Sequence, residues 1–371
     1  MRDEAPCYRH PELGFFALTR YVDVLEASQQ PLLYSSAQGT TLEHIDTSGL
    51  LPMMIFMDPP DHDVHRRLVS RAFTPRSVAA LESFVRKTAL GYLEPLADKG
   101  GGDFVEEFSA LLPMDVIMEL IGVPAPDRNQ LRRWMDSSLE RTEEPPFFPD
   151  EAILAMVSMT EYWTELLAEK RKHPDDGLMS RLCEAEVTEG GATNRLSDGE
   201  VIGFCSLIGA AGTETLTKLL ANAAVLFHRC PDQWEKLRAD PTLAAGAVEE
   251  TLRYWAPSQY QGRVLTDDVE LHGTRMAAGS RVLLVTGSAN RDEREYDEAD
   301  RFDIERQSHL AVGFGHGLHF CLGAALARLE GRVGLEEFSV LFPHYDVDEA
   351  KAERVHQSNV HGFSSVPFAA A

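Results

Sequence analysis

Residues 314–323 read FGHGLHFCLG, a glycine-rich loop that leads into a helix-forming run, CLGAALAR, from residue 321. A thiolate at the start of a helix is stabilised by free backbone N–H groups and by the positive end of the helix dipole. Gly315, Gly317 and Gly323 permit dihedral angles, and the close approach of a flat ligand, that a Cβ atom would block. The stretch therefore predicts that Cys321 is a thiolate at a helix N-terminus, beside a ligand.

Two other interpretations of this cysteine remain open from the loop alone. A lone cysteine is often a small buried hydrophobic residue, and we interpret the other four cysteines in that way. His316, His319 and Cys321 could instead be three zinc ligands. Structural zinc sites usually have four ligands, typically with two or more cysteines, but catalytic zinc can have three. The spacing of these residues does not exclude zinc.

Composition limits the class of protein. A length of 371 residues alone suggests two or three domains, but no linker divides the chain, so we expect one domain spanning 1–371. The net charge of −24 disfavours nucleic acid and anionic membranes as partners. No apolar stretch is long enough to span a membrane and no signal peptide is visible, so a cytoplasmic location is expected. Five cysteines at irregular spacing argue against a disulfide framework.

The pattern of apolar residues is mainly helical, with strands confined to short runs. A strand is expected at 13–19 and a helix at 21–30. Further amphipathic helices are expected at about 61–73, 75–99, 109–121, 126–140, 150–172, 242–255 and 321–341, with short strands around 260–285. The longest helix should run from 197 to about 228, because SDGE at 197–200 is a capping box and Pro231 lies beyond its end.

An unusual run, AAGTET at 210–215, lies in the middle of this long helix. A mid-helix glycine costs about 1 kcal/mol relative to alanine, and β-branched threonines add crowding. Thr213 and Thr215 could simply hydrogen-bond to the carbonyl one turn earlier. We favour a functional interpretation, in which the helix opens locally, small residues such as Gly212 make room for dioxygen, and Glu214 and Thr215 form an acid–alcohol pair.

Two further patterns place charged groups on single helical faces. Glu250 and Arg253 are three residues apart, a spacing that usually gives a solvated surface ion pair. His62 and Arg66 are four residues apart and therefore project from the same face. Zinc binding by His62 and His65 is the weaker interpretation, because no cysteine lies nearby in the sequence.

Together these motifs resemble those of the cytochrome P-450 family. The loop at 314–323 matches the family's haem-binding pattern FxxGx[RH]xCxG, and 211–215 matches its AGx[DE]T segment. DPPDHDVHRR at 58–67 resembles the family's DPPxHxxxRR, and ETLR at 250–253 its ExxR pair. The four motifs stand in the family's order over nearly the whole chain. The resemblance implies a mainly α cytochrome P-450 fold: a single large helical domain with a small β-rich part.

The resemblance also implies a role for each matching residue. Cys321 would be the proximal ligand of the haem iron, with haem b (iron protoporphyrin IX) as the cofactor. The groups implied for the two haem propionates are His62, Arg66, Arg263 and His319. A histidine at 319 would make its contact sensitive to pH. The other implied cofactor-binding positions are Phe314, Gly315, Gly323 and Ala211. The Glu250–Arg253 pair would be buried and structural, around the loop.

By the same resemblance the activity is that of a monooxygenase. Two electrons and protons delivered by Thr215 and Glu214 would allow one oxygen atom of O2 to enter an apolar small molecule, by hydroxylation or epoxidation, while the other leaves as water. No flavin or iron–sulfur motif is visible, so the expected electron donors are ferredoxin and ferredoxin reductase. Four arginines are either a local basic docking patch for that donor or scattered charges that keep the protein soluble: Arg67, Arg71, Arg76 and Arg328.

The substrate is not fixed by these motifs. Candidate substrate contacts, by family placement, are Leu50, Leu51, Met53, Met54, Phe204, Ile208, Gln259, Tyr260 and Val360. The family usually has a further helix and strand before the segment that matches PELGFF at 11–16, so the N-terminus is expected to be shorter than usual. The rival functions are a peroxide-driven haem-thiolate peroxygenase and a non-catalytic haem-binding or sensor protein.

Overall fold

Helices dominate the computed structural model of the chain, which describes residues 1–371 except 44–49, 140–141, 143–148, 190–191, 308–310 and 358. The α-helices are α1 (Tyr21–Ser28), α2 (Asp61–Ala72), α3 (Pro75–Ala79), α4 (Glu82–Asp98), α5 (Leu111–Ile121), α6 (Arg128–Leu139), α7 (Asp150–Lys172), α8 (Leu178–Glu184), α9 (Asp198–Arg229), α10 (Pro231–Ala239), α11 (Ala244–Tyr254), α12 (Thr286–Ala289) and α13 (Ala324–Leu341). Shorter 3-10 or π turns are η2 (Met54–Phe56), η3 (Val105–Ser109), η4 (Ala125–Asp127), η5 (Pro241–Leu243), η6 (Val312–Phe314) and η7 (Gly317–His319).

Most expected helices are present, but two boundaries were wrong for identifiable reasons. The helix expected at 75–99 is two helices, α3 and α4, because a capping box at Thr74 and Ser77 starts a short first helix and the chain turns before Glu82. Helix α10 was not expected at all. Pro231 was interpreted only as the end of the long helix, yet it occupies the first turn of α10, where proline is well tolerated.

The strands form small sheets around the helices. They are β1 (Cys7–Arg9), β2 (Phe16–Leu18), β3 (Tyr34–Ser35), β4 (Gly101–Asp103), β5 (Glu186–Glu189), β6 (Ala192–Arg195), β7 (Gln261–Leu265), β8 (Val269–Leu271), β9 (Thr274–Met276), β10 (Arg281–Leu284), β11 (Tyr345–Val347), β12 (Glu353–Arg354), β13 (Phe363–Ser365) and β14 (Pro367–Ala370). The largest sheet has the order β1-β2-β10-β7-β3 and joins the first and last thirds of the chain. The strand expected at 13–19 is only the three-residue β2.

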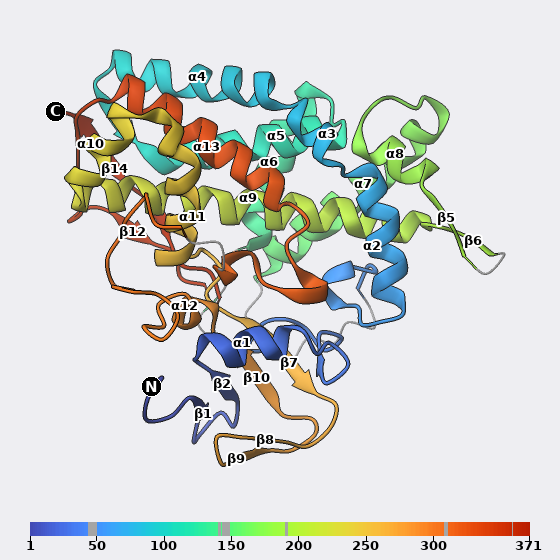
Figure 1. Ribbon diagram of the computed structural model, residues 1–371. Coiled ribbons are helices and arrows are strands. Elements are labelled where there is room, and N and C mark those ends of the chain that lie inside the picture. Colours follow the sequence, from blue (N-terminus) through green and yellow to red (C-terminus); the bar gives the residue numbers. More distant parts are fainter. Residues whose placement is uncertain (44–49, 140–141, 143–148, 190–191, 308–310, 358) are drawn as a thin grey trace.

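Helix α9 is the central element. It crosses the molecule between the helical part that holds α4 and α13 and the sheet that holds β2, β7 and β10 (Figure 1). Residues 216–227 of α9 are buried, and the helix packs against α5, α7, α11 and α13. A helix that is apolar on every side is stable only inside a core. The capping box that was expected at its start is present, between Ser197 and Glu200.

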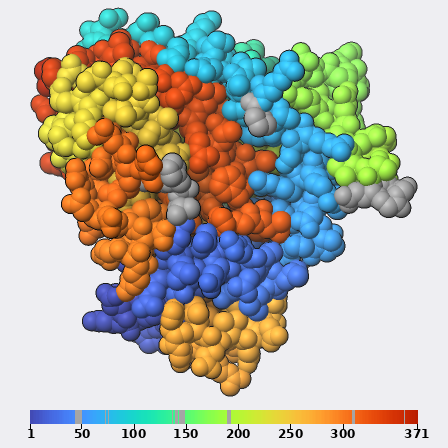
Figure 2. All heavy atoms as spheres, in the orientation of Figure 1, coloured from blue at the N-terminus to red at the C-terminus, as the bar shows by residue number. Residues whose placement is uncertain are grey.

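A second, smaller core lies under the largest sheet. It packs Phe16, Leu18, Val282 and Leu284 against α1 and is separate from the main helical core. On the face shown in Figure 2, α2 and the start of α13 lie side by side above α1. Along the described part of the chain, no helix is both long enough and apolar enough to cross a membrane.

One buried carboxyl group on α13 gives a pH-dependent prediction. Glu330 is 2% exposed and its Oε2 atom has no hydrogen-bond partner among the described residues. Burial raises its pKa well above the ordinary value, so the folded protein retains a proton that the unfolded chain releases above about pH 4.5. In that window the free energy of unfolding falls as pH rises, by about 1.4 kcal/mol per pH unit for one proton.

Glu330→Gln should therefore stabilise the protein increasingly as pH rises from 5 to 8. Denaturant midpoints of variant and wild type, measured at several pH values, give the difference directly. Other titrating groups cancel in that difference because they are common to both proteins. A difference that stays constant with pH would show that Glu330 is not a protonated group in the folded state.

Candidate functional site

The cysteine loop, residues 314–323, folds back on itself and packs against the end of α1. The backbone N–H of Cys321 donates to the carbonyl oxygen of Phe314, with an N···O distance of 2.9 Å. Gly315 and Gly317 have φ angles of +70° and +69°, a region that favours glycine. A Cβ atom on Gly317 would lie 2.3 Å from the carbonyl oxygen of Ser28, at the end of α1. The sequence expectation for these two glycines therefore agrees with the geometry.

Gly323 does not need such freedom. Its φ angle is −79°, and a Cβ atom there would be 3.9 Å from the Cys321 sulfur, an ordinary contact distance. Helix α13 also begins at Ala324, three residues later than expected. Gly323 is thus the N-cap residue of α13, and Cys321 lies just ahead of the helix.

The electrostatics at Cys321 differ from the expectation of a stabilised thiolate. Burial raises the pKa of the thiol, and this effect outweighs the backbone N–H groups of Gly323 and Ala324 and the charges of Arg66 and Arg328, which lower it. The helix N-terminus does act in the expected direction, but it is too weak alone. A metal ion would reverse the balance, because a coordinating thiol is deprotonated outright.

The zinc interpretation of the loop is not supported. The Nε2 atom of His316 is 3.0 Å from the side-chain nitrogen of Gln29, whereas Nε2 of His319 is 3.2 Å from the hydroxyl oxygen of Ser36. The two histidines therefore turn to different partners. Within the described ranges, no three His, Cys, Asp or Glu side chains are grouped so that they could hold a metal ion.

Four side chains expected to act together do converge. The ring of His319 lies against that of His62, with 4.4 Å between their centroids. Burial, and to a smaller extent the nearby Arg263, His62 and Arg66, lowers the pKa of His319 to about 3. His319 is thus neutral near pH 7, and the expected pH sensitivity of this position is not supported, although an anionic ligand beside it would oppose the shift.

The positive charge of this cluster lies on its two arginines, because the pKa values of both histidines are lowered below their ordinary value. Arg263 is 7% exposed, and burial lowers its pKa to about 10 despite the nearby carboxylate of Asp58. That carboxylate is also bound by the hydroxyl of Ser35 and, at 2.9 Å, by the backbone N–H of Ser36. Buried cations in proteins are normally paired. The cluster therefore suits a ligand that brings carboxylates.

His62 gives the sharpest sign of such a ligand. Its side chain is fully buried, and neither ring nitrogen has a hydrogen-bond partner among the described residues. Burial and the charge of Arg66 lower its pKa. Its Nδ1 atom is 3.9 Å from Oδ1 of Asp63, which is beyond hydrogen-bond distance. A buried imidazole without hydrogen bonds is costly, because its polar atoms have lost water and gained no hydrogen bond in return. The donor set next to Cys321 fits a haem with its two propionates.

The middle of α9 is more exposed to solvent than residues 201–205 and 216–227 on either side of it, which are buried. Residues 206–215, apart from Gly209, are at least partly accessible, and Ala211 is exposed. The hydroxyls of Thr213 and Thr215 each donate to the carbonyl four residues earlier, at 2.7 Å. The structure therefore has the back-bonded arrangement, and α9 is continuous, without the local opening that we expected.

The glycines of this segment serve helix packing. A Cβ atom on Gly212 would lie 3.0 Å from Cδ1 of Ile117 on α5, and one on Gly209 would lie 2.3 Å from Cε of Met135 on α6. The interpretation that Gly212 makes room for dioxygen thus lacks support, since Ile117 occupies that side. Residues 50–54, which hold four candidate substrate contacts, cross α9 nearer its start, where Gly203 meets the carbonyl of Pro52.

The two members of the acid–alcohol pair have separate partners. Thr215 is bonded to its own helix, as described. The Oε1 atom of Glu214 lies 3.1 Å from Nζ of Lys218 and accepts a hydrogen bond of 3.1 Å from the side-chain amide of Gln357. Glu214 therefore faces the C-terminal segment of the chain.

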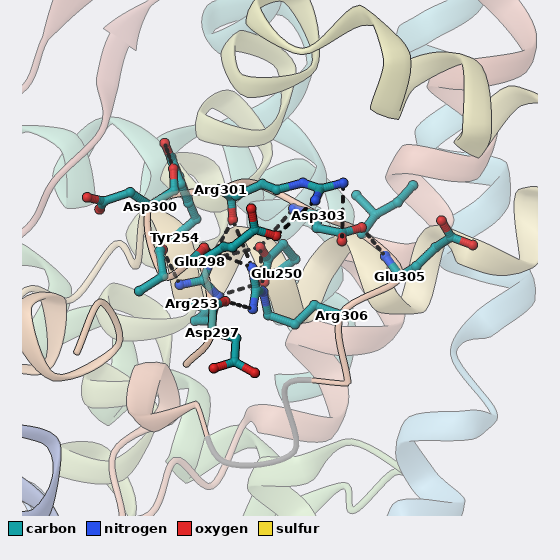
Figure 3. A network of polar contacts seen from close by, with 12 residues as sticks. Glu250, Arg253, Tyr254, Asp297, Glu298, Asp300, Arg301, Asp303, Glu305 and Arg306 are labelled. Carbon is teal, nitrogen blue, oxygen red and sulfur yellow. Dashed lines mark hydrogen bonds and ion pairs between the residues drawn. The ribbon is translucent and has the colours of Figure 1, made fainter. Parts of the chain in front are cut away.

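The Glu250–Arg253 pair is buried, as its resemblance implied. Both side chains are fully buried, and Arg253 Nε and Nη2 donate to the two carboxylate oxygens at 2.8 Å (Figure 3). The remaining guanidinium N–H groups donate to the carbonyls of Asn290, Ala299 and Arg301. Asn290 also accepts from the N–H of Val312 at the start of the cysteine loop, at 2.8 Å. The pair thus fixes the segments that lead to that loop.

Sequence reasoning missed several residues of the site. Ser36 and Asp58 bond to or neutralise members of the cationic cluster, and Lys218 and Gln357 bind Glu214. Lys218 had a visible signal, because it lies four residues after Glu214 on an expected helix. Asp58 belongs to the DPPDHDVHRR motif, although no role was assigned to it, whereas Ser36 and Gln357 meet the site through long-range contacts that no local pattern reveals.

Comparisons with known proteins agree with this geometry. Residues 151–360 match the family model described as Cytochrome P450. Cytochrome P450 130 of Mycobacterium tuberculosis is 38% identical, with 99% of this chain and 93% of that protein covered. The vitamin D(3) 25-hydroxylase of Pseudonocardia autotrophica is 39% identical, over 96% of this chain and 88% of the relative. Substrate-free CYP109E1 from Bacillus megaterium has a TM-score of 0.92 at 30% identity, covering 100% of this chain and 96% of that one. The cysteine loop, the buried Glu250–Arg253 pair and this similarity over nearly the whole chain place the protein in the cytochrome P450 family, the haem monooxygenases.

Proposed function

We propose that this monooxygenase, one domain over 1–371, acts in the cytoplasm and inserts one oxygen atom of O2 into an apolar small molecule, with electrons from ferredoxin and ferredoxin reductase. The observation that carries the proposal is the buried group of His62, Arg263 and His319 with Arg66 next to Cys321, in which neither ring nitrogen of His62 has a hydrogen-bond partner among the described residues. The two carboxylates of a haem b would accept hydrogen bonds from this group, and its iron atom would take Cys321 as a ligand. The overall stoichiometry is RH + O2 + 2e⁻ + 2H⁺ → ROH + H2O.

The cofactor would be held by groups from three parts of the chain. Cys321 would supply the iron ligand from the loop before α13, while His62 and Arg66 from α2, Arg263 from β7 and His319 would bind the propionates. Phe314, Gly315 and Gly323 would line the loop side of the cofactor and Ala211 the α9 side. When bound, haem with a thiolate ligand supplies the activation of dioxygen. The chain's own contribution is to orient that group, to compensate its charges and to exclude water.

Proton delivery is assigned to Thr215 and Glu214. Because the Thr215 hydroxyl donates its proton to the Ala211 carbonyl, its oxygen is left to accept a hydrogen bond. A hydroxyl in that state can hold a water molecule or another donor at the accessible part of α9. Glu214, one residue earlier, is bound to Lys218 and Gln357 and leads toward the C-terminal segment.

An apolar substrate is supported by the character of the candidate contact residues and by the relatives. Met54 and Phe204 are buried in the main core and Leu51 and Ile208 pack against it. Methionine side chains adapt to irregular apolar ligands. Among the structural neighbours, CYP109E1 has been solved in complex with testosterone and with corticosterone. A rigid, largely apolar molecule of that kind is a sensible first probe.

The electron donor would dock near the cysteine loop. Phe320, beside Cys321, is 38% exposed, and Arg328 lies over the ring of Phe314 at 4.7 Å. Arg76 is exposed on α3, whereas Arg71 donates to the carbonyl of Glu186. Arg328 also pairs with Glu249 at 2.5 Å, so its charge is partly compensated. An exposed aromatic group beside basic side chains suits a small acidic protein.

The absorption spectrum of the reduced, haem-loaded protein with and without carbon monoxide tests this assignment. A strongly red-shifted Soret band in the presence of carbon monoxide is expected for iron with a thiolate ligand. A haem-loaded sample without that band would refute the proposed function.

Thr215→Ala should keep the red-shifted band but divert electrons into hydrogen peroxide. Without the hydroxyl, the proton needed to complete O2 reduction to product and water is misdelivered, and O2 + 2e⁻ + 2H⁺ → H2O2 competes. General acid–base groups of this kind contribute roughly 10²–10⁴-fold. Product and peroxide formed per electron are the measurement, with Thr217→Ala as the matched control on the same helix. An unchanged product yield per electron would favour the peroxide-driven alternative or another proton route.

A further inference from the structure

Lys218 is a buried lysine with one carboxylate partner. It is 4% exposed, and its Nζ atom is 3.1 Å from Oε1 of Glu214, one helical turn earlier. Lysines are almost never this buried unless they are paired. The side chain of Glu214 is itself only 19% exposed, so the ion pair lies largely out of water. Such a pair is strong only when its geometry is fixed.

The C-terminal segment fixes that geometry. Gly362 covers the stem of Lys218 so closely that a Cβ atom there would lie 2.5 Å from Cβ and 2.8 Å from Cγ of the lysine. Gln357 adds the second donor to Glu214 Oε1, at 3.1 Å. Asn222, one turn after Lys218, donates to the carbonyl of His361 at 3.3 Å. The same segment therefore holds the lysine stem, the carboxylate and the helix behind them.

We propose that Lys218 is a positioning residue for proton delivery: it compensates the charge of Glu214 and turns that carboxylate toward Gln357 in the C-terminal segment. This inference rests on the proposed function of Glu214 and Thr215. It adds the side of the molecule from which protons would reach Glu214. Protons would reach Glu214 from the C-terminal segment, where Gln357 is partly exposed.

The groups that face this carboxylate make the role of Lys218 specific. Lys218 and Gln357 both contact Oε1, so Lys218 supplies the positive charge at that oxygen and Gln357 only a neutral hydrogen bond. Removing the lysine charge therefore leaves a partly buried carboxylate with an amide alone. Desolvation then favours the protonated acid. Lys218→Arg keeps the positive charge, although a guanidinium group is larger than the ammonium group of the lysine that packs against Gly362.

The direct experiment is infrared difference spectroscopy of the haem-loaded protein across pH 6–8. The carboxylic-acid stretch of Glu214 is identified as the band that is lost when Glu214→Gln is added. Lys218→Met should raise the protonated fraction of Glu214 at pH 7 above that of wild type, because the carboxylate loses the ammonium that lies 3.1 Å from its Oε1 atom. Lys218→Arg should restore the low fraction.

Turnover gives the second readout. Product per electron should fall in Lys218→Met and become dependent on pH, whereas the red-shifted band with carbon monoxide should remain, because Cys321 is untouched. Lys351→Met, which breaks an exposed pair with Asp348, is the charge-matched control and should change neither readout.

The outcomes separate the possibilities. A folded Lys218→Met protein with the wild-type acid fraction and wild-type coupling at every pH would overturn the role of Lys218. Loss of the red-shifted band in all variants, wild type included, would instead refute the proposed function. If Lys218→Met is too unstable to study, Lys218→Gln tests the same charge with a polar side chain, and unchanged values there would equally reject the proposal.

Discussion

Replacing Cys321 with serine is expected to abolish the red-shifted Soret band of the reduced protein with carbon monoxide. The hydroxyl of serine gives up its proton far less readily than a thiol, and burial, which already raises the pKa of Cys321, would disfavour an alkoxide further. A neutral hydroxyl cannot donate the electron density that a thiolate gives to iron. The loop itself should stay folded, because its contacts run through the backbone of Cys321 and through Gly317.

The experiment needs a measure of haem content and a control cysteine. Pyridine haemochrome content, set beside the spectrum, separates loss of the ligand from loss of the cofactor. Cys230→Ser is the matched control, since Cys230 is also partly buried and ends a helix, α9. The control should keep both the band and the haem. A Cys321→Ser protein that keeps the red-shifted band would contradict the assignment of Cys321 as the iron ligand.

The sequence predicted this loop well because its signals are local. Gly315 and Gly317 adopt the left-handed angles that their position suggested, and the helix follows within three residues. The sign of the Cys321 pKa shift was wrong for a physical reason. The helix N-terminus could be inferred from the sequence, but the burial that outweighs it depends on side chains from elsewhere in the chain.

Segment 210–215 shows the opposite limit. Its composition signalled something unusual, yet composition could not tell whether Gly212 leaves space or fills it. The answer depends on Ile117, nearly a hundred residues away, which packs against Gly212. Likewise, the sequence shows that Glu214 and Lys218 are four residues apart, but it does not show that Gly362 covers the Lys218 side chain. Patterns along one helix can be predicted, whereas the partner that meets each face requires the fold.

The second large effect is expected from Arg253→Met. All five N–H groups of this guanidinium donate hydrogen bonds, two to Glu250 and three to the carbonyls of Asn290, Ala299 and Arg301. Removing one member of a buried ion pair typically lowers the free energy of unfolding by about 3–5 kcal/mol, because an uncompensated charge remains. Here three carbonyls also lose their donors, although Arg306, 3.4 Å from Glu250, compensates part of the charge.

Lysine should not rescue this site. Its ammonium has three donors at one point, whereas the structure needs five in a planar fork that spans Glu250 and the carbonyls. Arg253→Lys is therefore expected to lose most of the same stability. Asn290 connects the network to Val312, which lies just ahead of the cysteine loop. Both variants should therefore also retain less haem after purification. Denaturant midpoints and haem content measure the two effects.

The neighbouring helix offers a control with identical spacing. Glu235 and Arg238 on α10 also form an ion pair three residues apart, at 2.8 Å, but the glutamate is 57% exposed. Arg238→Met should change the free energy of unfolding by no more than about 1 kcal/mol, because water replaces the lost partner. If Arg253→Met and Arg238→Met shifted the midpoint equally, burial would not be the source of the effect. The loss of stability would then come from the helices themselves, and the network around Asn290 would have no special part in holding the cysteine loop.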